Sequence, residues 1–250
     1  MSKTVSAARL LLQHRQNQTQ IDHLPESCQP QDLTEALAIQ EEVSRLYAEQ
    51  GELVGGWKCL LPTEDRVAVA PIYQSGVQSG ASCSLTAING EAPIEPELAF
   101  VFGQSLPPRD RPYSDHEVYS AISEVRMALE LVRSRYFHPN ECSFVELLAD
   151  GLFNQGVYLG PVVTESPAEF MVELEYEHEH KVFDGKHPNA DARVSLVWLV
   201  NFLNERGYGV EAGQAVITGS YVGLVNVPFT EITMTYAGLG QMKVKLQQRT

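Results

Sequence analysis

The chain has 250 residues, 44% of them hydrophobic, which suffices for one large domain or for one domain with a small helical appendage. It carries 18 Lys and Arg against 32 Asp and Glu, a formal charge of −14, which argues against nucleic acids and anionic membrane surfaces as partners. No apolar run approaches the ~20 residues that cross a bilayer. The four cysteines are scattered without a Cys-x-x-Cys pair, so we expect a cytoplasmic protein with reduced thiols.

The first fifty residues predict helices. Apolar residues form one patch over residues 7–12 and recur near helical spacing over 33–46, and a proline-containing loop at 22–30 separates the two segments. We therefore expect a helical cap over residues 1–52, followed by the main body at 53–250.

Beyond the cap, short segments rich in β-branched and aromatic residues, broken by Gly and Pro, predict strands. The predicted strands are 54–61, 97–102, 127–132, 157–159, 170–176, 215–218, 231–236 and 242–246. One helix begins at Ser114, where Glu117 completes a capping box, and another runs over 195–206 and ends at Gly207. Many strands, few helices and no regular β-α alternation favour a β-rich α+β fold.

Two glutamates, Glu95 and Glu97, stand one residue apart where an apolar segment begins. In an extended chain, residues two apart face the same side, and two like charges beside a core are costly without a compensating cation. This pair therefore indicates a metal site.

Glu130 adds a third carboxylate in a setting that is otherwise apolar, residues 127–132. Three carboxylates without an adjacent Cys or His suit a hard divalent ion such as Mg²⁺ or Mn²⁺. Pairing of each glutamate with an arginine, for example Arg133 or Arg135, or exposure to water, is the alternative.

Lys58 lies in an apolar strand segment, after Gly55, Gly56 and Trp57. It must extend to solvent, pair with a carboxylate, or act as an acid or base. The two glycines allow a ligand to approach the backbone closely.

Glu and His residues crowd positions 173–180, which invites interpretation as a metal site. Every second residue there is charged or polar and no hydrophobic shell surrounds them, so we predict a solvated hairpin followed by a turn at Asp184-Gly185. His138, just before Pro139, is predicted to be a loop residue. The sequence has no P-loop, Gly-x-Gly-x-x-Gly or Gly-x-Ser-x-Gly motif, so nucleotide cofactors and serine-hydrolase chemistry are unsupported.

Three segments in this order resemble the 2-keto-4-pentenoate hydratase and 4-oxalocrotonate decarboxylase branch of the fumarylacetoacetate hydrolase superfamily. They are Gly56-Trp57-Lys58, Glu95 to Phe100 and Ala128 to Tyr136. Further matches run through most of the chain, at Ala36 to Gln40, Ala149-Asp150, Asn154 to Gly156, Val216 to Ser220 and Gly238 to Gly240. The resemblance implies a mixed β-sandwich roll with an N-terminal helical cap, assembled as a homo-oligomer.

The resemblance also implies a Mg²⁺ or Mn²⁺ ion held by Glu95, Glu97 and Glu130, which acts as a Lewis acid on a small 2-keto acid. Lys58 is then the general acid/base or an electrostatic partner of the enolate. The substrate pocket is lined by Asp150, Thr218, Gly219 and Ser220.

Three positions depart from the family pattern. Ile72, in Pro71-Ile72-Tyr73-Gln74, stands where relatives often carry an acidic residue. Arg133 replaces the Asp that usually precedes the Ser-Arg pair, and Gly151 replaces an Asn that commonly follows the loop aspartate. The expected metal ligands are present, whereas positions that handle protons or read the distal part of a substrate differ.

Together these features predict a metal-dependent lyase that adds water to a 2-hydroxydienoate. Decarboxylation of an oxo-diacid is the close alternative, since both reactions share an enolate. Hydrolysis of an acylpyruvate ranks lower because it needs a His near a Glu, and we expect His14 and His23 in the cap to lack such a setting. A non-catalytic relative that keeps the fold and the metal is the alternative from another class.

Overall fold

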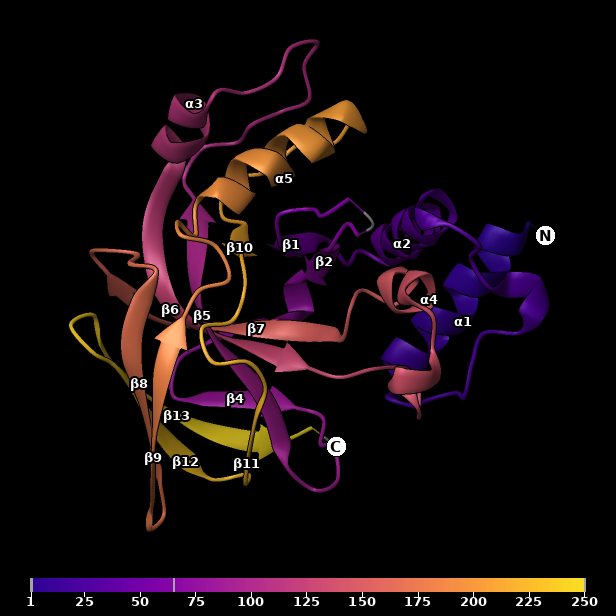
Figure 1. Cartoon of the computed structure of the whole chain (residues 1–250). Coiled ribbons are helices and arrows are strands. Elements are labelled where there is room, and N and C mark those ends of the chain that lie inside the picture. Colours follow the sequence, from indigo (N-terminus) through magenta and orange to yellow (C-terminus); the bar gives the residue numbers. More distant parts are fainter. Residues whose placement is uncertain (1, 65, 250) are drawn as a thin grey trace.

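The computed structural model describes residues 2–64 and 66–249 (Figure 1). The helices are α1 (Lys3–Asn17), α2 (Leu33–Ala48), α3 (Asp115–Ser120), α4 (Phe144–Ala149) and α5 (Val194–Glu205), with 3-10 helices at Glu26–Cys28, Gln74–Gly76 and Pro139–Glu141. The strands are β1 (Val54–Cys59), β2 (Val69–Tyr73), β3 (Val77–Ser79), β4 (Ser82–Leu85), β5 (Ala92–Phe102), β6 (Ile122–Val132), β7 (Asn154–Val163), β8 (Glu169–Tyr176), β9 (Glu179–Lys186), β10 (Ala215–Ile217), β11 (Val225–Val227), β12 (Glu231–Tyr236) and β13 (Gly240–Gln248).

The strands form two sheets. The larger has the order β2-β1-β10-β5-β6-β7-β3, with β11 paired to β5, and the smaller has the order β4-β13-β12-β8-β9. Parallel pairs, such as β1 with β10 and β4 with β13, occur among antiparallel ones. One face of β5 and β6, with Leu98 and Leu129, packs against Leu174 and Met234 of the smaller sheet in a shared core. The mixed β-sandwich roll expected from the sequence is confirmed.

Helices α1, α2 and α4 lie together at one end of the molecule (Figure 1). Ser2 and Asp32 cap α1 and α2 by accepting hydrogen bonds from backbone amides in their first turns. The buried Leu11 and Ile39 belong to the same hydrophobic cluster as Phe100 of β5. The helical cap thus packs on the body through one continuous core, and its boundary at residue 52 stays a prediction.

In the described ranges, no helix combines the length and the apolar character that crossing a bilayer requires.

The long strand β5 contains two prolines, Pro93 and Pro96, and it changes partner around Pro96. It pairs with β11 up to Ile94 and with β10 from Ala99 onward. Between these pairs, the carbonyl of Pro96 accepts hydrogen bonds from the Tyr221 amide and the Ser220 hydroxyl. Because backbone N–H and C=O of one residue point to the same side in an antiparallel strand, the missing N–H faces this gap and costs no ladder bond.

The eight predicted strands, the two helices predicted in the cap and the two predicted in the body are present, with shifted ends. The sequence analysis listed no strand at β2, β3, β4, β9 or β11 and no helix at α4, and it started β5 and β6 five residues too late. Pro71 lies in β2, which among the described residues pairs with β1 alone and forms a sheet edge where proline is tolerated. A proline in a short segment weakens the sequence signal for a strand.

The hairpin of β8 and β9 is confirmed, but the turn predicted at Asp184-Gly185 is wrong. The turn is at Glu177-His178, and Gly185 lies inside β9 opposite Phe170. A Cβ at Gly185 would come within 2.5 Å of the Phe170 carbonyl oxygen, so the glycine permits close strand approach rather than a turn.

Candidate active site

Strand register brings the three predicted glutamates together. Glu95 of β5 lies directly opposite Glu130 of β6, and Glu97 is two residues farther along β5 on the same face. One carboxylate oxygen from each residue lies within 4.8 Å of the others. Glu97 and Glu130 are only 2% and 1% exposed, so their charges are removed from water.

The floor beside these carboxylates is a small apolar cluster of its own. Ala99, Ala128, Val157 and Ile217 come from β5, β6, β7 and β10, and Ile72 comes from β2. All are buried, and strand pairing places them on the same face as the glutamates. The apolar surroundings strengthen electrostatic interactions at the carboxylates.

Lys58 of β1 reaches the same site across β10. Its Nζ donates to Glu130 Oε1 at 2.7 Å and to the Leu152 carbonyl at 3.0 Å. Of the fates open to this lysine in the sequence, pairing with a carboxylate is the one observed. The arginine alternative fails for Glu130, since Arg135 pairs with Asp150 instead.

The hydrogen bonds leave one carboxylate oxygen without a partner. Glu130 Oε1 also accepts from Asn154 Nδ2 at 2.9 Å, whereas Oε2 is buried with no hydrogen-bond partner among the described residues. An unsatisfied buried carboxylate oxygen is costly, and a cation would satisfy it. Oxygen donors from three carboxylates fit a hard divalent ion such as Mg²⁺ or Mn²⁺.

The proton affinities of these groups reflect their crowding. Burial raises the pKa of Glu95, and the Glu130 carboxylate raises it further. Burial, with Glu130 as the second cause, raises the pKa of Glu97 well above its usual range. Burial alone would lower the pKa of Lys58, but the carboxylates, Glu130 foremost, raise it overall. Lys58 is therefore an ammonium at neutral pH and holds a proton at Nζ.

The predicted pocket residues Thr218, Gly219 and Ser220 form a loop next to Glu97. The Gly219 amide donates to Glu97 Oε2 at 2.9 Å. Gly219 has φ +131°, and a Cβ there would lie 2.8 Å from both Leu60 and Pro188, so only glycine fits. Ser220 and Tyr221 hydrogen-bond to the Pro96 carbonyl in the gap between β11 and β10, which holds this loop in place. The loop in turn orients the Glu97 carboxylate.

His187 is a buried site neighbour that sequence reasoning missed. Its Nε2 lies 3.1 Å from the Thr218 carbonyl and 3.3 Å from the Thr218 hydroxyl. Burial lowers the pKa of His187, which keeps the imidazole neutral. The sequence offered no signal, because a lone histidine after a strand has no pattern of its own.

Asp150 is buried, and its carboxylate faces two arginines. Arg135 Nε lies 2.5 Å from Asp150 Oδ1, and Arg15 approaches the same oxygen at 3.8 Å. Arg135 Nη1 also donates to the carbonyl of Asn154, the residue whose side chain contacts Glu130. The role of Asp150 in substrate binding, like those of Thr218, Gly219 and Ser220, stays a prediction.

A cavity of about 80 Å³ lies beyond Asn154 and is lined by four arginines. The arginines are Arg15, Arg133, Arg135 and Arg249. Arg133 Nη2 donates to the Gln18 carbonyl, and Nη1 is buried without a hydrogen-bond partner among the described residues. No Asp or Glu of residues 2–64 or 66–249 lines the cavity, which makes it an anion-attracting region in an acidic chain.

One of the three departures from the family pattern, Arg133, lines this cavity, and a second, Gly151, lies against its Arg15. Arg133 contributes the unpartnered nitrogen. Gly151 has φ +82°, and a Cβ there would lie 2.7 Å from Arg15 Nη2. The third departure, Ile72, is wholly buried in the apolar floor and offers no acid or base.

Two further groups of metal-ligand side chains occur in the described ranges. His180 Nε2 lies 3.2 Å from Glu173 Oε2 on the exposed hairpin, as expected of a solvated strand pair. His23 lies 3.5 Å from Glu146, so the expectation that the cap histidines lack a neighbouring glutamate is wrong for His23. Glu146 comes from α4, which the sequence reading had left out.

Neither the family models nor the curated proteins compared with this chain match its sequence. Solved structures match its fold. The chain is similar to 4-oxalocrotonate decarboxylase from Pseudomonas putida G7 complexed with magnesium and adipate, with a TM-score of 0.80 and 19% identity, covering 98% of this chain and 97% of that one. The same enzyme complexed with calcium and acetate gives a TM-score of 0.76 at 20% identity, with the same coverage.

A putative fumarylacetoacetate hydrolase family protein from Yersinia pestis CO92 gives a TM-score of 0.54 at 14% identity, covering 76% of this chain and 91% of that one. These likenesses confirm the fold that the sequence resemblance implied. The decarboxylase structures match nearly the whole chain, including the helical cap.

The raised pKa values predict how the stability of the metal-free protein depends on pH. The folded-state pKa of Glu97 exceeds its unfolded value, so its contribution to stability is fully present below about pH 4.5 and is lost as pH rises toward the folded pKa. We expect Glu97→Gln to stabilise the metal-free protein at pH 7.5, by on the order of 1–3 kcal/mol, and much less at pH 4.5.

Urea unfolding in a chelator at both pH values measures this difference. Glu173→Gln, on the exposed hairpin, is the matched control and should leave the curve unchanged. If the free energy of unfolding changed equally in wild type and Glu97→Gln between the two pH values, the raised pKa of Glu97 would be contradicted.

Proposed function

We propose that this chain is a divalent-metal-dependent lyase acting on a small 2-keto acid, with Mg²⁺ or Mn²⁺ held by Glu95, Glu97 and Glu130. The observation that carries the proposal is the buried trio of carboxylates with one unpartnered oxygen, next to the Lys58 ammonium. The likeness in fold to a decarboxylase complexed with magnesium and adipate supports it.

The bound ion would supply a Lewis acid that draws negative charge onto the carboxylate and keto oxygens of the substrate. The chain itself supplies the surroundings. The apolar floor around Ala128 and Ile217 excludes water, and the Gly219 amide fixes the orientation of Glu97. Lys58 Nζ, held by Glu130 and the Leu152 carbonyl, provides a proton next to the reacting atoms.

We propose decarboxylation of an unsaturated oxo-diacid ahead of hydration, which reverses the order favoured by the sequence. Hydration needs a group that takes a proton from water, and Ile72 offers none where relatives often carry an acid. Decarboxylation needs only an electron sink and a proton donor. The fold also matches a 4-oxalocrotonate decarboxylase over 98% of this chain.

In this reaction the bond to the departing carboxylate carbon breaks and carbon dioxide leaves. The electron pair passes along the conjugated chain to the keto oxygen, which gives an enolate. Lys58 Nζ then returns a proton to the enolate and recovers one from solvent through its exposed edge, since 18% of its side chain is accessible. Hydration of a 2-hydroxydienoate remains the second candidate, favoured by the sequence resemblance.

Metal binding tests the ligand assignment. We expect Glu97→Gln to weaken Mn²⁺ binding by roughly 100-fold or more, because a buried ligand to a divalent ion is lost. Electron paramagnetic resonance of free Mn²⁺ gives the affinity. Glu173→Gln, in the exposed Glu173, Glu175 and His180 group, should bind as the wild type does. Equal affinities in wild type and Glu97→Gln would refute the assignment.

Turnover tests the reaction. With Mg²⁺ or Mn²⁺ present, we expect carbon dioxide release from an unsaturated oxo-diacid such as 4-oxalocrotonate, and kcat lowered about 10²–10⁴-fold in Lys58→Met. Loss of conjugated ultraviolet absorbance from a 2-hydroxydienoate, without carbon dioxide release from oxo-diacids, would establish the hydratase instead. Metal binding without turnover of either substrate class would establish the non-catalytic relative.

A substitution in the arginine-lined cavity tests whether the chain recognises a diacid. We propose that Arg133 receives the second carboxylate of the substrate, since its Nη1 is unpartnered and the cavity borders the site at Asn154. In the proposed reaction that carboxylate leaves as carbon dioxide, so Arg133 would bind its charge in the ground state and lose this contact in the transition state. Arg133→Ala should therefore raise KM for the diacid about tenfold or more without lowering kcat. Arg66→Ala, outside the cavity, is the control. An unchanged KM would exclude this role.

A further inference from the structure

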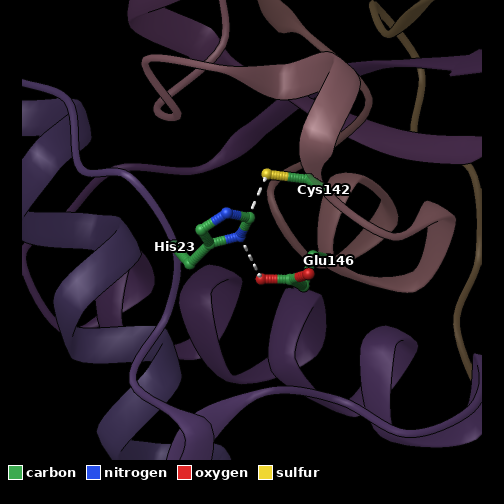
Figure 2. Close-up of side chains that lie close together, drawn as sticks. All are labelled: His23, Cys142 and Glu146. Atoms are coloured by element: carbon green, nitrogen blue, oxygen red, sulfur yellow. Dashed lines mark hydrogen bonds and ion pairs between the residues drawn. The ribbon is translucent and has the colours of Figure 1, made fainter.

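Three potential metal ligands that the proposed reaction does not use converge between the cap and the body. His23 comes from the loop between α1 and α2, Cys142 precedes α4, and Glu146 lies in its first turn. Figure 2 shows the three side chains pointing toward one another from these two segments. More than a hundred residues of chain separate His23 from the other two, so only the fold assembles this group.

One nitrogen of His23 faces both partners. His23 Nδ1 lies 3.7 Å from Cys142 Sγ and 3.5 Å from Glu146 Oε1. A proton relay of the Cys-His-acid type uses the two ring nitrogens separately, one toward the thiol and the other toward the acid. Convergence of both partners on a single nitrogen does not fit a relay and fits three donors around one point.

Both separations from His23 Nδ1 match those of a tetrahedral zinc site, and the three ligand atoms all lie within 4.8 Å of one another. Ligand distances of about 2.0–2.1 Å for nitrogen and oxygen and about 2.3 Å for sulfur place neighbouring tetrahedral ligands roughly 3.3–3.6 Å apart. The observed 3.5 Å and 3.7 Å separations need adjustments of only a few tenths of an ångström. A fourth position is available to water, since the His23 side chain is 37% exposed and leaves a path for the ion.

Glu146 supplies an independent sign that a cation belongs here. Its Oε2 completes a capping box by accepting from the amide and the hydroxyl of Ser143. Its Oε1 is buried without a hydrogen-bond partner among the described residues, in a residue that is 5% exposed, and it points at His23. A carboxylate oxygen removed from water in this way is costly unless a cation or donor satisfies it.

We propose that His23 Nδ1, Cys142 Sγ and Glu146 Oε1 bind one Zn²⁺ ion that ties the cap to the body. Nitrogen and sulfur donors distinguish this site from the all-oxygen glutamate trio, so the two sites select different metals. Since His23 and α4 belong to different segments of the chain, the ion would cross-link the loop after α1 to the start of α4.

The test uses the whole chain with Glu97→Gln, which weakens metal binding at the glutamate trio. The protein is first stripped of metal and then kept in saturating Mg²⁺. We expect one equivalent of Co²⁺ to give a thiolate charge-transfer band that Zn²⁺ displaces, and Zn²⁺ at a hundredfold excess over Kd to raise Tm by about 5 °C or more. Cys142→Ser should abolish the band, and His23→Gln should weaken Zn²⁺ binding at least about 100-fold.

His138→Gln is the matched control, because His138 is an exposed histidine in the loop between β6 and α4 that also contains Cys142. It should bind Zn²⁺ as tightly as its parent. Absence of the thiolate band in the parent protein, or Zn²⁺ binding unchanged by both Cys142→Ser and His23→Gln, would overturn the proposal. These readouts do not involve turnover, so they stand apart from the outcome for the lyase.

Discussion

Strand pairing places three carboxylates on one face of the sheet, and their mutual repulsion is the constraint that the surrounding residues must offset. Glu95 and Glu130 are cross-strand partners, and Glu97 follows on the same face, almost fully removed from water. Lys58 and Asn154 compensate a single oxygen of Glu130, and Gly219 compensates one of Glu97. The remaining charge is a cost to the folded protein alone and a binding site for a divalent cation.

The scaffold that sustains this arrangement is the long strand β5. It exchanges β11 for β10 around Pro96, which lies between Glu95 and Glu97 and has no N–H to donate to a neighbouring strand. The gap admits the loop that carries Gly219 to Glu97. The proline, the loop that it admits and the orientation of Glu97 therefore depend on one another. The apolar floor beside them lowers the local dielectric, which strengthens the interactions of the charged groups.

The cap and the body meet through polar contacts as well as through the shared apolar core. Arg15 of α1 approaches Asp150 just after α4, and His23 approaches Glu146 within α4. The proposed chemistries stay separate because their donors differ: oxygen donors in the glutamate trio, guanidinium groups in the small cavity, and mixed nitrogen, sulfur and oxygen donors at His23.

The sequence by itself determined the fold class, the helical cap, most strands and the residues Glu95, Glu97, Glu130 and Lys58. It could do so because local periodicity sets which residues share a face, and because a charge in an apolar segment is anomalous wherever the segment goes. Only the tertiary structure decided which partner each charge finds. Asn154, the arginine-lined cavity and the contact of His23 with Glu146 depend on pairings between segments distant in the chain, and no local pattern encodes those distances.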